Sequence, residues 1–274
     1  MARSFQDPPA EFRSKPFWAW NGELNEQEIV RQVKIFKQMG FGGSFMHSRT
    51  GLQTEYLGDA WFRMVNAAAT EAGKQGIQAW LYDEDRWPSG FAGGLVTEKV
   101  EYRMKFLSMH SMPMTSFHWQ DDFVAAFGCD VQGTATKNCT RIFANTELAA
   151  LATKTALAFT VEDMKPASDY NGYTYVDTLN RKATDEFIHV THDRYQQHSG
   201  SQFGKTLPGI FSDEPQRGPV FNGFSITNPN YHQMAPWTDA LPAQFQHRFG
   251  YDLLDRLPEL FLYKDGSLVS PVKW

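Results

Sequence analysis

Residues 78–90 have the sequence QAWLYDEDRWPSG, and this stretch decides the expected fold. It begins as a short apolar run, ends abruptly in the carboxylates Asp83, Glu84 and Asp85, and then reaches Pro88. A strand that is buried on both faces has a continuous apolar run of this kind. In parallel α/β proteins the reactive groups lie at the carboxyl ends of the strands. Clustered carboxylates are costly to desolvate and seldom stabilise a fold, so the segment indicates an enzyme.

Three other segments repeat this pattern of an apolar run that ends in polar groups. Residues 208–215, PGIFSDEP, end in Asp213 and Glu214. Residues 16–21 end in Trp20 and Asn21. Residues 43–49, GSFMHSR, contain His47 and Arg49. If the four strands are parallel, all of these polar groups line one edge of a sheet.

The segments between the strands are predicted to be helices. Asn25 with Glu28 resembles a capping box, and Ile29, Val33, Phe36 and Met39 fall on one face before Gly40 ends the helix. A second helix is expected from Asp59 to near Gly76, with Trp61, Val65, Ala68 and Ala72 buried. A third is expected from the cap Asn180 to about Gln197, with Ala183, Phe187 and Val190 facing inward. Alternating strands and helices predict right-handed parallel units.

This alternation stops between residues 104 and 170, where short β-like pieces such as 123–127 and 155–159 are separated by polar turns. We interpret them as a small β-rich insertion after the third strand. Residues 1–103 would then hold the first barrel units, and residues 171–274 further ones. A (β/α)8 barrel needs about 250 residues, so the remaining chain has room for about half of one. The alternatives are an open α/β sheet or the first half of a TIM-type barrel, and the absence of a terminating element at 271–274 favours the half barrel.

Composition and charge indicate which partners, location and cysteine chemistry to expect. The chain has 274 residues, 42% of them apolar, and a net charge of −5 without a basic stripe, so nucleic acid and anionic membranes are poor partners. No apolar leader precedes residue 10, which predicts a cytoplasmic location. Cys129 and Cys139 are too few for a disulfide scaffold and are expected to be free, reduced thiols, and the sequon at Asn138 is taken as chance. The oligomeric state stays open.

The strand ends carry the chemistry that glycoside hydrolysis requires. One carboxylic acid protonates the leaving oxygen, and a second carboxylate acts as a nucleophile or activates water. Like charges in one cluster raise one pKa, and a cation such as Arg49 would keep its neighbour ionised. Eight tryptophans support a sugar site only weakly, although Trp20 and Trp87 could flank one.

Other interpretations of these residues stay open. Residues 89–94, SGFAGG, lack the lysine of a P-loop, so a close turn that brings backbone near substrate is the better interpretation. His189 and His192, with Asp193, are expected on a helix surface. A divalent-metal hydrolase that uses Asp83, Asp85, Asp213 and His47 is a further alternative.

The sequence resembles a known family at several of these segments. They are residues 16–22, 42–49, 82–90 with 92–94, 175–177, 191–193 and 211–215. Together they are similar to large bacterial glycoside hydrolases related to the α-L-rhamnosidases of family 106, over almost the whole of this chain but only the N-terminal part of those enzymes. The resemblance implies a (β/α)8 catalytic barrel, a carboxylate pair and, in the rhamnosidases, a calcium ion near the substrate. Glu214 matches the strand-end glutamate expected to be the general acid, and Glu84 or Asp85 would be its partner.

The sequence therefore predicts a glycosidase that cleaves a terminal, α-L-rhamnoside-like sugar. Predicted catalytic residues are Glu214, Glu84 and Asp85; predicted substrate-binding residues are Trp20, Asn21, His47, Arg49, Asp83, Trp87 and Asp213. The alternative is a non-catalytic carbohydrate-binding half barrel or fragment. The sugar, the linkage and the metal dependence stay open.

Overall fold

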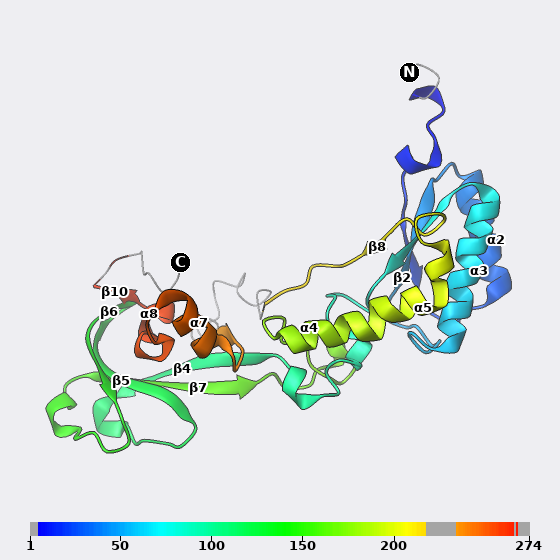
Figure 1. The fold of residues 1–274 in the computed structure, drawn as a ribbon. Coiled ribbons are helices and arrows are strands. Elements are labelled where there is room, and N and C mark those ends of the chain that lie inside the picture. Colours follow the sequence, from blue (N-terminus) through cyan, green and yellow to red (C-terminus); the bar gives the residue numbers. More distant parts are fainter. Residues whose placement is uncertain (1–4, 218–233, 266, 268–274) are drawn as a thin grey trace. The chain divides into compact units, whose positions relative to one another are not determined.

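The computed structural model describes residues 5–217, 234–265 and 267 (Figure 1). The chain divides into two compact units, Met1–Tyr102 with Pro166–Gln216, and Arg103–Lys165 with Arg217–Trp274. The first unit therefore contains chain from both sides of the β-rich segment. Its boundaries fall within a few residues of those expected on either side of the insertion. Residues 271–274, where the sequence shows no terminating element, lie outside the described residues.

The described part of the first unit contains a parallel sheet of four strands. In spatial order they are β1 (Phe17–Trp20), β2 (Gly43–Ser48), β3 (Gln78–Tyr82) and β8 (Ile210–Phe211), and every neighbouring pair is parallel. The prediction of a mixed α/β fold with a parallel sheet is therefore confirmed. Four strands do not by themselves establish a closed barrel.

Helices α2 (Glu26–Gln38) and α3 (Asp59–Gln75) pack on one face of this sheet (Figure 1). The Asn25 side chain accepts a hydrogen bond from the Glu28 amide, as the capping pattern predicted. Alternate strand residues such as Trp18 and Leu81 join the core that these helices bury. Met39 was expected in that core but is 65% exposed, because the helix ends there and its backbone turns toward Gly40.

The opposite face of the sheet carries a row of aromatic rings. Phe17, Phe45 and Trp80 come from successive strands, with ring centroids 5.3 Å apart in each neighbouring pair. Phe211 of β8 lies 5.1 Å from Phe17. Phe17 is 55% exposed, and the other three rings are half-buried. The sheet is thus apolar on both faces, as its continuous apolar strands predicted.

A long helix precedes β8 in the chain. It comprises α4 (Arg181–Ile188), a π-helical segment (His189–Asp193) and α5 (Arg194–Ser199). The Asn180 side chain caps its start by accepting from the Lys182 amide, as expected. Ala183 and Phe187 are buried, and Val190 is half-buried. The wider π turn was not predicted.

The second unit is built around an antiparallel sheet. Its described strands are β10 (Tyr263–Lys264), β6 (Ala135–Ile142), β5 (Phe123–Gln132), β7 (Thr155–Asp163), β4 (Lys105–Pro113) and β9 (Met234–Trp237), in that spatial order, and only the β10–β6 pair is parallel. Leucines and aromatics near α7 (Leu241–Phe249) and α8 (Pro258–Phe261) share its core. β9 and β10 therefore extend the sheet of the insertion, whereas residues 171–274 were expected to add barrel units.

The two cysteines form a disulfide, so the prediction of free thiols is wrong. Cys129 lies on β5 and Cys139 on β6, and the antiparallel pairing brings their Cα atoms to 4.1 Å. A spacing of ten residues in the sequence did not reveal this hairpin. No helix among the described residues is both long enough and apolar enough to cross a membrane.

Candidate functional site

The carboxyl ends of β2, β3 and β8 bring His47, Asp83, Asp85 and Asp213 into one network of contacts. All four strands run in the same direction, so their ends meet at one edge of the sheet. This confirms the placement expected from the apolar runs. The roles of the individual side chains are set by their contacts.

Asp213 lies at the centre of the cluster. Its Oδ2 atom accepts a hydrogen bond from the Tyr82 hydroxyl at 3.2 Å and lies 3.8 Å from His47 Nε2. Ser89 makes two hydrogen bonds to the Asp213 backbone, each of 2.8 Å. The Ser89 hydroxyl accepts from the Asp213 amide, and the Ser89 amide donates to the Asp213 carbonyl. The Asp213 side chain keeps 18% of its surface exposed. No hydrogen bond from the described residues reaches Oδ1.

His47 faces Asp213 in its neutral form. Its Nδ1 atom lies 2.9 Å from the Ser48 carbonyl, which can only accept, so Nδ1 carries the proton and Nε2 presents a lone pair. The ring stacks on Tyr82 with centroids 3.8 Å apart. Burial and the nearby charge of Arg49 lower the pKa of His47. The neutral imidazole can therefore accept a proton at Nε2 beside the Asp213 carboxylate.

Glu84 is fully buried inside a loop of its own chain. Its Oε2 accepts the amides of Gly90, Phe91 and Ala92 at 2.8–3.0 Å. Its Oε1 accepts the amides of Asp85 at 2.9 Å and Gly93 at 2.6 Å. Burial raises the pKa of Glu84 to about 8, although these N–H donors act to lower it. Five amide N–H groups thus point at the two oxygens, and these donors favour the ionised form of the carboxyl group.

The Gly-rich loop of residues 89–94 therefore binds a carboxylate of the protein itself. Gly90 and Gly93 have φ values of +139° and +65°, which L-residues with side chains rarely adopt. A Cβ atom at Gly90 would lie 2.8 Å from Val176 Cγ1. The sequence predicted that this turn would bring backbone toward a substrate; the structure directs four of its amides at Glu84.

The two neighbours of Glu84 are also occupied by protein donors. Asp83 has 1% of its side chain exposed and accepts from Ser89 Oγ at 2.6 Å and from His192 Nε2 at 3.2 Å. Asp85 accepts from Ser48 Oγ at 2.9 Å and from Asn171 Nδ2 at 2.7 Å, one on each oxygen. Both carboxylates thus act as internal acceptors.

Glu214 is exposed and has a positive φ of 46°. Its Oε2 accepts a hydrogen bond from Trp87 Nε1 at 3.0 Å. This bond connects the loop after β3 with the end of β8. The Glu214 carboxylate and the half-buried indole of Trp87 therefore lie side by side.

Three other predicted residues lie away from this network. Trp20 is 2% exposed and packs edge-on against Trp18 and Trp61 in the core, so it cannot serve as a sugar platform. Asn21 and Arg49 are exposed at the ends of their strands.

Five residues of the network were not predicted as site residues: Ser48, Tyr82, Ser89, Asn171 and His192. Ser89 could have been found from its place in the WPSG segment, directly after the carboxylates. His192 was assigned to a helix surface, because no pattern in the sequence reveals the π turn that directs it at Asp83.

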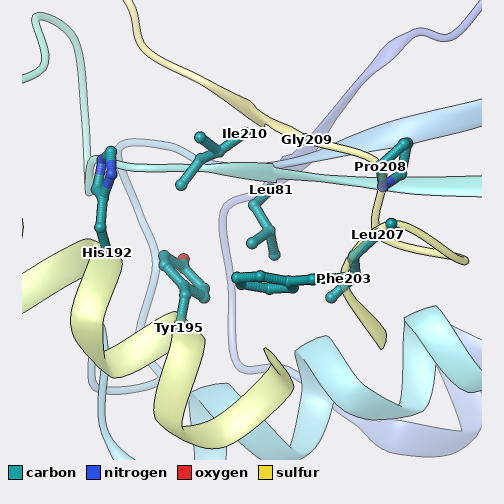
Figure 2. A pocket seen from close by; sticks show the side chains of 9 residues that line it. Leu81, His192, Tyr195, Phe203, Leu207, Pro208, Gly209 and Ile210 are labelled. Carbon is teal, nitrogen blue, oxygen red and sulfur yellow. The ribbon is translucent and has the colours of Figure 1, made fainter. Parts of the chain in front are cut away.

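An apolar cavity of about 240 Å³ lies on the helix-facing side of β3 and β8 (Figure 2). Leu81, Tyr195, Phe203 and Ile210 line it, with His192 at its polar end. None of the carboxylates of the strand-end network lines this cavity. It is therefore distinct from the candidate site.

The donor set does not favour a bound metal ion. Nowhere in the described residues do three His, Cys, Asp or Glu side chains converge as potential ligands. The oxygens of Asp83, Glu84 and Asp85 already accept hydrogen bonds from the protein. The described residues therefore present no cluster of these side chains for calcium or for a hydrolytic metal ion.

The fold and site define a mixed α/β protein with a carboxylate-rich strand edge. No protein-family model and no curated protein matches the chain. A solved structure, a rhamnosidase from Novosphingobium sp. PP1Y, is similar with a TM-score of 0.55 and 12% sequence identity. The similarity covers 95% of this chain and 43% of that enzyme's chain. At this identity the likeness is one of fold.

Proposed function

We propose that the protein is a glycoside hydrolase related to the family 106 α-L-rhamnosidases and acts on a terminal, rhamnoside-like sugar. One observation carries the proposal: two carboxylates with accessible surface, Asp213 and Glu214, follow the same strand beside the indole of Trp87. Carboxylates provide the acid–base chemistry, and an aromatic face packs against a sugar ring. The fold shared with a rhamnosidase supports the same class of substrate.

The contacts support different catalytic roles for Glu214 and Asp213. Glu214 is the general acid that protonates the leaving oxygen, as the sequence predicted. Asp213 is the carboxylate that acts on the sugar or on a water molecule: its Oδ2 lies beside His47 Nε2, and its Oδ1 accepts no hydrogen bond from the described residues. Glu84 and Asp85 stay predicted candidates, but hydrogen bonds from the protein already occupy both oxygens of each.

We further propose that the four parallel strands belong to a (β/α)8 barrel. The aromatic row of Phe17, Phe45, Trp80 and Phe211 would then face the barrel interior, which bulky apolar side chains fill. In this arrangement the strand-end carboxylates occupy the catalytic face. The fold shared with a larger rhamnosidase supports this assignment.

A carbohydrate-binding protein without catalysis is the second candidate. The observation in its favour is that protein donors already hold three of the strand-end carboxylates, whereas the exposed Glu214 lies beside the indole of Trp87. Such a protein would bind the sugar without hydrolysing it.

Aryl glycosides that include an α-L-rhamnoside separate the two candidates. We expect hydrolysis by the wild-type chain, and Glu214→Gln to lower kcat by about 100-fold or more on a substrate with a poor leaving group. The loss should be smaller on a substrate with an activated leaving group, which needs no proton. Glu23→Gln, a change at an exposed glutamate, is the control and should leave kcat unaltered. Sugar binding measured by calorimetry without turnover would identify a carbohydrate-binding protein. A chain that neither hydrolyses the glycosides nor binds the sugar would refute both candidates.

A further inference from the structure

The π-helical segment His189–Asp193 lies in the middle of the long helix, between α4 and α5. Two side chains of this helix hold consecutive residues of the strand end. His192 Nε2 lies 3.2 Å from Asp83 Oδ2, and the Tyr195 hydroxyl donates to the Tyr82 carbonyl at 3.1 Å. Figure 2 shows both side chains extending from the helix toward the sheet. A π turn inside an α-helix is energetically unfavourable and is frequent at functional sites.

Among the described residues, His192 supplies one of the two side-chain hydrogen bonds that hold the Asp83 carboxylate. The Asp83 side chain is 1% exposed, and its other partner is Ser89 Oγ at 2.6 Å. A buried carboxylate that loses a donor is strongly destabilised and reorients or takes up a proton. His192, with 36% of its side chain exposed, therefore controls a group that solvent does not reach.

Ser89 passes this constraint to Asp213. A hydroxyl has one proton, and the short contact with Asp83 Oδ1 uses it. The lone pairs of Ser89 Oγ then point at the Asp213 amide, which donates at 2.8 Å. If Asp83 turned away, the hydroxyl proton would be free to point elsewhere and this bond would weaken. The connection runs from the helix through Asp83 and Ser89 to the backbone of Asp213.

We propose that His192 is a positioning residue that fixes Asp213 through Asp83 and Ser89, without contacting the substrate. The effect on catalysis rests on the proposed glycosidase function. The effect on the Asp213 backbone does not, because it follows from the hydrogen bonds alone. The two can therefore be tested separately.

The test compares three variants of the full chain. His192→Leu removes the donor, whereas His192→Gln places an amide N–H near the position of Nε2. His189→Leu is the control, since His189 lies on the same π segment with 74% of its side chain exposed. The first measurement is hydrogen exchange of the Asp213 amide by NMR. We expect exchange roughly tenfold faster in His192→Leu, near wild type in His192→Gln and unaltered in His189→Leu.

The second measurement is the hydrolysis of the aryl glycoside. In His192→Leu kcat should fall about tenfold or more with KM unaltered, and His192→Gln should recover most of it. If His192→Leu does not fold, His192→Asn, whose amide stops short of the Nε2 position, should give the same faster exchange. An Asp213 amide that exchanges at the wild-type rate in folded His192→Leu or His192→Asn overturns the inference. A wild-type chain without turnover refutes the glycosidase proposal and leaves the exchange result to decide on His192.

Discussion

The carboxylate of Glu84 provides the sharpest test of how the site is built. In Glu84→Gln the shape of the side chain is kept, but one oxygen becomes an NH2 group. If the amide oxygen takes the Oε2 position, the new NH2 group faces the N–H groups of Asp85 and Gly93. Each buried donor left without an acceptor costs about 1–3 kcal/mol. The free energy of unfolding should therefore fall by roughly 2–6 kcal/mol.

Urea unfolding followed by tryptophan fluorescence measures this change, and the melting temperature should drop by about 10 °C. Glu71→Gln is the matched control, because Glu71 is also buried, at 5% exposure, but accepts from Gln75 and lies 3.6 Å from Lys74. Loss of that partly exposed pair should cost at most about 1 kcal/mol. If Glu84→Gln were no less stable than Glu71→Gln, the loop would not depend on the carboxylate and the reasoning would fail.

Three further predictions concern single groups. Ser89→Ala should lower the free energy of unfolding by about 2–4 kcal/mol in urea titrations, because it removes the hydrogen bonds to Asp83 and Asp213. The control is Ser199→Ala, which should leave the free energy of unfolding unchanged. Ser199 is also buried, but its Oγ has no hydrogen-bond partner in the described structure. Non-reducing peptide mapping should recover Cys129 and Cys139 in one linked peptide pair, and Cys139→Ser should cost about 2–3 kcal/mol of unfolding free energy. The lowered pKa of His47 means that the folded chain binds fewer protons than the unfolded one just below pH ~6.5, so stability should fall as pH falls through that value. His47→Gln should remove this part of the pH slope, and an unchanged slope would contradict it.

The parallel sheet could be predicted because its signals are local. The apolar runs that become β2 and β3 end in polar residues, and Asn25 and Asn180 cap their helices with the side-chain bonds expected from the sequence. The second unit was harder, since pairing between distant strands leaves little local trace. β9 joins β4 across more than a hundred residues of chain. The disulfide was missed for the same reason, because only the β5–β6 pairing shows that the cysteines are neighbours.

The sequence predicts where the strands end better than it predicts the contacts of the side chains there. Parallel strands necessarily bring His47, Asp83 and Asp213 to one edge, and the sequence shows where each strand stops. Burial of individual side chains depends on the alternation of the strand, which places Trp20 in the core instead of the site. The contact between His192 and Asp83 lies at a π turn, which the spacing of residues in the sequence does not predict.

The five strand-end carboxylates divide into two groups by their hydrogen-bond partners. Asp83, Glu84 and Asp85 accept from side chains and amides of the protein, so their charge is used to hold loops and strand ends together. Asp213 and Glu214 keep accessible surface and have fewer donors. Burial and N–H donors act in opposite directions on such a carboxylate: the donors lower the pKa of Glu84, and burial raises it to about 8. The first group is therefore the frame that holds Asp213 and Glu214 in place, which is why substitutions in it should change stability before they change chemistry.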